Sequence, residues 1–120
     1  YEPELQDVVN ISSNIWDVLH DGMRRVIQTH SQFDGLGIEV AGKTGTAELD
    51  LRHPNHGLFV GYAPASDPEY AVAIRIANGY SSGNACLIAN DTFKYMYNLA
   101  DKDSILTGVA STDTSDTSND

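Results

Sequence analysis

The segment Lys43-Thr44-Gly45-Thr46-Ala47 combines residue types that can bind a carboxylate. A lysine supplies positive charge, and two threonine hydroxyls can donate hydrogen bonds. Gly45 has no side chain, so a substrate can approach the backbone N–H groups beside it closely. In an extended strand Thr44 and Thr46 lie on one side and Lys43 on the other. A second interpretation stays open, because β-branched residues also favour strands for packing reasons alone.

The same lysine completes a phosphate-loop pattern. Residues 37–44 read Gly-Ile-Glu-Val-Ala-Gly-Lys-Thr and match G-x-x-x-x-G-K-[ST]. A P-loop needs a helix after the lysine, whose N-terminus faces the phosphates. Here the residues within and after the pattern are typical of a strand, so we expect no nucleotide at this segment.

Two amphipathic helices are predicted to flank this region. Apolar residues recur at helical spacing between residues 12 and 30, and again between 85 and 99. Both segments are preceded by residue types that cap helix N-termini. These residues are Ser12 or Ser13 for the first helix and Ser82 or Asn84 for the second.

Three strands are predicted between the helices, at 38–49, 57–63 and 70–77, because β-branched residues and glycines are frequent there. Prolines and Asp67 make residues 64–69 a turn, so the last two strands form a hairpin. Val8 and Val9 suggest one further short strand. The third strand has a face of small residues, mostly alanine, and we expect a helix to pack on it. This order predicts an α/β protein of the α+β type, with an antiparallel sheet flanked by helices.

Composition excludes several function classes. The chain has 120 residues, of which 41% are hydrophobic, enough for one small core. Its net charge of −10 repels phosphate backbones and anionic membrane surfaces, so we expect no nucleic acid and no membrane contact by this segment. Cys86 is the only cysteine, which excludes a disulfide scaffold and a multi-thiolate metal site. We expect it to be a small buried hydrophobe.

Asp50, His53 and His56 form the one cluster of metal-ligating residue types. Pro54 lies between the two histidines, so they do not share a regular helix that would direct both rings at one metal ion. We therefore expect neither a metal nor a cofactor.

The segment that contains the lysine motif is followed by two further segments in a specific order. Residues 40–48 read Val-Ala-Gly-Lys-Thr-Gly-Thr-Ala-Glu, residues 56–64 read His-Gly-Leu-Phe-Val-Gly-Tyr-Ala-Pro, and residues 67–74 read Asp-Pro-Glu-Tyr-Ala-Val-Ala-Ile. Upstream, residues 22–27 read Gly-Met-Arg-Arg-Val-Ile. Together they resemble the C-terminal part of penicillin-binding protein transpeptidase domains, most closely those of class B, within a β-lactamase-like fold. The resemblance covers about residues 12–100.

The resemblance implies serine acyl transfer. In this family a serine attacks the D-Ala-D-Ala peptide of peptidoglycan precursors or a β-lactam, and the acyl-enzyme passes to an amine or to water. Lys43 would support the proton network and the positive potential. The hydroxyls of Thr44 and Thr46 would bind the substrate carboxylate, and the Thr46 N–H would contribute to the oxyanion hole. The implied catalytic residues are Lys43 and Thr46, and the implied substrate-binding residues are Thr44, Gly45 and Thr46.

The chain also departs from the family's pattern. It contains no Ser-x-x-Lys, which carries the nucleophile. Ser12-x-Asn14 and Ser82-x-Asn84 match S-x-N in letters, but their positions relative to Lys43 are wrong, and we interpret them as helix caps. Leu58 stands where many relatives have an aromatic residue. We therefore predict that the chain carries one wall of an active site and is inactive alone.

The predicted organisation is a C-terminal transpeptidase fragment at 1–100 and a disordered acidic Ser/Thr-rich tail at 101–120. Expected partners are a peptidoglycan stem peptide or a β-lactam, and the remainder of the transpeptidase domain. A strand edge left exposed by the missing part predicts a homodimer. The parent protein would act on the extracellular face of the bacterial cytoplasmic membrane, anchored by a segment absent from this chain. The alternative is a non-catalytic β-lactam-sensing or protein-interaction module that keeps the strand.

Overall fold

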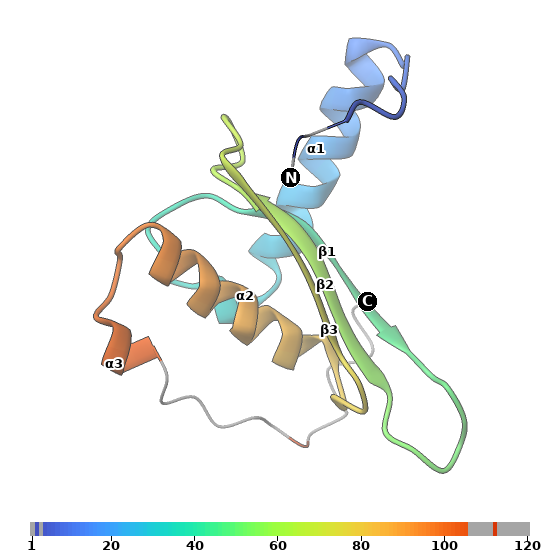
Figure 1. The fold of residues 1–120 in the computed structure, drawn as a ribbon, viewed down its shortest axis with the longest axis vertical. Coiled ribbons are helices and arrows are strands. Elements are labelled where there is room, and N and C mark those ends of the chain that lie inside the picture. Colours follow the sequence, from blue (N-terminus) through green and yellow to red (C-terminus); the bar gives the residue numbers. More distant parts are fainter. Residues whose placement is uncertain (1, 3, 106–111, 113–120) are drawn as a thin grey trace.

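The computed structural model of the chain describes residues 2, 4–105 and 112 (Figure 1). Its elements run in the predicted order of helix, three strands and helix. They are α1 (Ser13–Gln28), the 3-10 helix η1 (Ser31–Phe33), β1 (Ala41–Ala47), β2 (His56–Ala63), β3 (Tyr70–Ile76), α2 (Ser82–Met96) and the short α3 (Lys102–Ile105).

The three strands form one antiparallel sheet in the order β1-β2-β3. In the register, Thr44 and Ile74 are the β1 and β3 partners of Phe59 on β2, so the three side chains share one face. Helix α2 lies across that face, and α1 contacts β1 and extends past the sheet (Figure 1). The α+β class with an antiparallel sheet and flanking helices is confirmed. Val8 and Val9 are not in a strand, which corrects that prediction.

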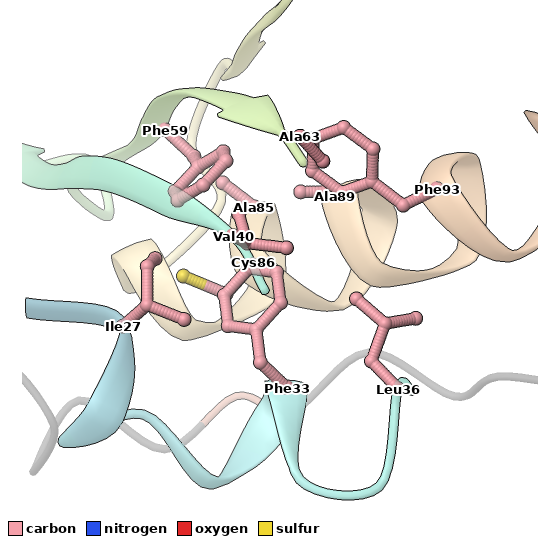
Figure 2. Close-up of a cluster of buried hydrophobic side chains, with 10 residues drawn as sticks. All are labelled: Ile27, Phe33, Leu36, Val40, Phe59, Ala63, Ala85, Cys86, Ala89 and Phe93. Atoms are coloured by element: carbon pink, nitrogen blue, oxygen red, sulfur yellow. The ribbon is translucent and has the colours of Figure 1, made fainter. Parts of the chain in front are cut away.

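The core lies between the sheet, α2 and the segment that runs from the end of α1 through η1 to β1 (Figure 2). Phe59, Phe93 and Cys86 are fully buried there, which confirms the prediction for the cysteine. The sequence assigned the wrong face of β3 to the helix: Val72, Ile74 and Ile76 pack against the core, and the alanine face is exposed. The small residues that allow close packing are on α2 instead, where Ala85 and Ala89 are fully buried. Burying the larger side chains removes more apolar surface from water.

Strand β1 is shorter than predicted at both ends. Ala41 pairs with Tyr62, and after Ala63 the chain turns at Pro64. At the other end, the Asp50 carboxylate accepts the backbone N–H groups of Arg52 and His53 and closes a turn.

Helix α1 begins after Ser12, as predicted, but the N-cap of α2 is Ser81 rather than Ser82 or Asn84. The Asn84 side chain instead donates to the carbonyl of Gly79 in the preceding turn.

Beyond residue 100, α3 forms with Ile105 buried. The rest of the predicted tail lies outside the described residues except for Thr112, so its disorder stays a prediction.

Candidate active site

The predicted site residues lie on β1, which is an edge strand of the described sheet. Lys43 is exposed, and its Nζ donates to the backbone carbonyl of Thr44 at 2.8 Å. Thr44 is 5% exposed, whereas Gly45 and Thr46 are half-buried. The alternation of the strand holds throughout, so Lys43 and the two threonines lie on opposite faces. The Lys43 ammonium nevertheless reaches a backbone atom of its neighbour.

The face that carries Lys43 holds an open groove across all three strands. We call this side of the sheet, opposite α2, the open face. The groove has a volume of about 390 Å³ and its wall includes Lys43, Gly45, Leu58, Val60 and Arg75. Helix α1 covers only the end of the open face near Tyr62, where the rings of His20 and Tyr62 are 5.8 Å apart.

The open face is positively charged although the chain is acidic. None of the residues in β1, β2 and β3 is acidic, and Lys43 and Arg75 both line the groove. The middle of the groove is apolar, with Leu58 and Val60 between the two cations. Such a surface suits an anionic group held next to an apolar body. Sequence reasoning did not select Arg75. The available signal was the two-residue spacing along the strand, which places Arg75 on the same face as Ala71 and Ala73.

The hydroxyl of Thr44 is buried, and within the part of the chain that the structure describes it has no hydrogen-bond partner. An unsatisfied buried hydroxyl costs about 1–3 kcal/mol. Thr46 differs, because its Oγ1 accepts the backbone N–H of Ser82 at 3.3 Å. The first turn of α2 therefore contacts the end of the Lys43–Thr46 segment.

The alternative chemistries have less support in this arrangement. Lys43 and Thr44 lie inside β1 rather than at a helix N-terminus, so the P-loop geometry is absent there. The His53 ring contacts the Asp50 carboxylate at 2.9 Å, but His56 accepts the Asn78 N–H elsewhere, so the three do not converge. The pKa of Asp50 is lowered by the Arg52 N–H and by the His53 side chain. Among residues 2, 4–105 and 112 no group of three or more His, Cys, Asp or Glu could hold a metal ion.

No described helix is long and apolar enough to cross a membrane.

Comparison with known proteins assigns the chain to a family. Residues 1–97 match the model of the penicillin-binding protein transpeptidase domain. The peptidoglycan D,D-transpeptidase MrdA of Acinetobacter baumannii is 36% identical over 104 residues, which cover 75% of this chain and 15% of that protein. Penicillin-binding protein 2B of Streptococcus pneumoniae is 32% identical over 110 residues, covering 78% of this chain and 16% of its own.

Solved structures agree with these sequence relatives. PBP2 of Pseudomonas aeruginosa in complex with WCK 5153 has a TM-score of 0.64 and 30% identity, over 85% of this chain and 24% of that chain. Penicillin-binding protein A of M. tuberculosis, as its penicillin G acyl-enzyme complex, has a TM-score of 0.55 and 26% identity, over 75% and 21% of the two chains. The chain thus spans about a sixth of the curated relatives described above. It belongs to the penicillin-binding protein transpeptidase domain family.

Proposed function

We propose that this chain forms the Lys-Thr-Gly wall of the active site of a serine-type peptidoglycan D,D-transpeptidase that β-lactams acylate. The observation that carries the proposal is the edge strand β1, where Lys43, Thr44 and Gly45 border an open, cationic groove and Thr46 follows them on the same strand. The nucleophilic serine belongs to the part of the parent protein outside this chain, because no Ser-x-x-Lys occurs in it. The isolated chain is then inactive.

In the proposed reaction the serine oxygen attacks a peptide or lactam carbonyl and forms an ester, while the C–N bond breaks and the nitrogen takes up a proton. Negative charge develops on the carbonyl oxygen, and the Thr46 backbone N–H stabilises it. Lys43 contributes positive potential and supports the proton transfers. Gly45 leaves the backbone accessible, and the hydroxyls of Thr44 and Thr46 bind the substrate carboxylate. An amine or water then takes the acyl group.

The contact between Lys43 and the Thr44 carbonyl supports this assignment. In an antiparallel strand the backbone N–H and C=O of alternate residues point the same way. Thr46 is two residues from Thr44, so its N–H points toward the same edge of β1 as the Thr44 carbonyl, which the Lys43 ammonium contacts. The Thr44 hydroxyl, which has no partner among the described residues, gives further support, because a ligand or another part of the protein would satisfy it.

The remainder of the transpeptidase domain is proposed to cover two surfaces. One is the outer edge of β3, with which no described strand pairs. The other is the N-terminal half of α1, where Ile15, Val18 and Leu19 are 52%, 74% and 47% exposed. An uncovered apolar stripe of this kind marks an interaction surface. We further propose that the parent acts on the extracellular face of the bacterial cytoplasmic membrane, held by an anchor outside this chain, with a peptidoglycan stem peptide as substrate.

A labelled penicillin tests this function. The test protein is a chimaera in which residues 1–97 replace the matching segment of the A. baumannii transpeptidase, hereafter the chimaera. We expect the chimaera to be labelled and the isolated chain to remain unlabelled. Labelling of the isolated chain would contradict the absence of a nucleophile, and a folded chimaera that is not labelled would contradict the proposed function.

A further inference from the structure

Residues 77–81, here named the 77–81 turn, connect β3 to α2 and lie against the end of β1 that carries Thr46. Two backbone positions in this turn, Asn78 and Tyr80, have positive φ values of 54° and 67°, so the chain reverses sharply. The turn ends at Ser81, and the next residue, Ser82, donates its N–H to Thr46 Oγ1 across a separation of 36 residues. The position of the turn therefore determines where that N–H lies.

Three hydrogen bonds hold the turn in place. His56 Nδ1 accepts the Asn78 N–H at 3.0 Å, and the Asn55 carbonyl accepts the Tyr80 N–H at 3.0 Å. On the other side, the Asn84 side chain donates to the Gly79 carbonyl at 2.8 Å. The turn is thus tied both to the start of β2 and to α2.

Gly57 allows the turn to approach β1. It is the β2 partner of Thr46, and a Cβ at this position would lie 2.3 Å from the Ser81 carbonyl oxygen. No side chain fits there unless the Ser81–Ser82 backbone moves. Such a movement would take the Ser82 N–H away from the Thr46 hydroxyl.

We infer that Gly57 and His56 are positioning residues for the Thr46 hydroxyl, acting through the 77–81 turn and the Ser82 N–H. A hydroxyl oxygen that accepts an N–H directs its own hydrogen away from that donor, so the contact restrains the position of the Thr46 oxygen and excludes O–H directions toward Ser82. This inference rests on the proposed function, in which that hydroxyl binds the substrate carboxylate. Preorganised donors of this kind gain strength because they need not reorient when the ligand binds.

The test compares acylation of the chimaera by a penicillin and by its methyl ester, which lacks the carboxylate charge. Gly57→Ala is expected to slow acylation by the acid about tenfold and acylation by the ester much less. The control is Lys94→Ala on α2, away from the surfaces proposed to be covered, where the ammonium lies 3.7 Å from the Asp91 carboxylate, and both rates should stay unchanged. Equal loss with acid and ester in Gly57→Ala would overturn the inference, because general damage affects both substrates.

A milder pair of variants keeps the test decisive if Gly57→Ala does not fold. His56→Asn retains an acceptor at the reach of Nδ1, whereas His56→Gln places its amide at the reach of Nε2. We expect the acid-to-ester ratio to be preserved in His56→Asn and lowered in His56→Gln. Identical ratios in both would refute the role of His56. If the unmodified chimaera is not acylated at all, the proposed function fails rather than the positioning role.

Discussion

Gly42 and Gly61 lie opposite each other on β1 and β2, and the ring of Phe59 covers both positions. A Cβ on either glycine would lie 2.6 Å from Phe59 Cζ. The fully buried ring can therefore lie flat against the sheet, directly beside the Lys43–Thr46 segment. The core and the proposed site thus share strand β1. Gly42 makes room for the buried Phe59 ring, whereas Gly45 belongs to the proposed site.

Substitution of these glycines should separate stability from activity. Gly42→Ala forces the Phe59 ring to move and should destabilise the chimaera by about 1–3 kcal/mol. Gly45→Ala places its Cβ 3.5 Å from Leu58, an ordinary contact, and should change stability by less than about 0.5 kcal/mol. It should nevertheless slow penicillin acylation, because the methyl group narrows the approach to the strand. Denaturant unfolding and acylation rates measure both effects; a destabilised Gly45→Ala variant would contradict this division.

The Tyr97 hydroxyl donates to the Ala63 carbonyl at 2.7 Å and ties the end of α2 to the end of β2. Tyr97→Phe should lower the melting temperature, whereas Tyr95→Phe, at a side chain that is 57% exposed, should not.

Burial, and then the charge of Glu69, raises the pKa of Tyr97 above its ordinary value of 10.0. The folded state therefore holds the Tyr97 proton more tightly than the unfolded state does. The neutral hydroxyl thus contributes to the free energy of unfolding below pH 10, and this contribution is lost as the pH rises through the pKa of the folded state. A spectroscopic titration in which Tyr97 ionises below pH 10 would refute this.

The exposed apolar stripe of α1 should matter only when the rest of the domain is present. Ile15→Asp should leave the isolated chain nearly unchanged, because the side chain is half exposed and an acid near a helix N-terminus is tolerated. In the chimaera it should cost about 3 kcal/mol or more, because an unpaired charge becomes buried. Ile88→Asp on α2, at 47% exposure, is the matched control and should act equally in both contexts. If Ile15→Asp changed the free energy of unfolding equally in the isolated chain and in the chimaera, the apolar stripe of α1 would stay uncovered in the whole domain.

The isolated chain should associate through β3. This strand ends the described sheet, so no described strand pairs with its outer edge. Unpaired backbone groups on a sheet edge pair readily with another chain. Sedimentation velocity should show a sedimentation coefficient that rises with concentration, and the chimaera should not show this rise. A chain that remains strictly monomeric at all concentrations would exclude the edge contact.

Local periodicity in the sequence was sufficient to predict the helices and strands, but it did not predict which of their faces pack together. The 3.6-residue repeat predicts α1, and β-branched residues with the turn at 64–69 predict the hairpin of β2 and β3. Alternation along β3 identifies two faces, yet it does not say which one α2 covers. That choice depends on α2, with its small residues Ala85 and Ala89, packing in the same core as Val72 and Ile74, a match between distant segments.

The site was predictable to a similar extent. Lys43 to Thr46 could be selected from residue type and resemblance, and their alternation on β1 holds. The pairing of Thr46 with Ser82 could not be predicted, because it depends on the left-handed backbone of Asn78 and Tyr80 and on the missing side chain of Gly57. Arg75 and Lys43 line the same groove because of the register of the three strands, which the sequence does not give.

The acylation rate of Lys43→Ala in the chimaera tests the central claim most directly. Lys43 is exposed, so the substitution should leave folding intact, and loss of its charge beside the reacting carbonyl should slow penicillin acylation by about 100-fold or more. The control is Lys94→Ala on α2, whose ammonium lies 3.7 Å from the Asp91 carboxylate, and its rate should stay within about twofold. An unchanged rate in Lys43→Ala would contradict the catalytic role and favour a sensing or interaction module that only retains the strand.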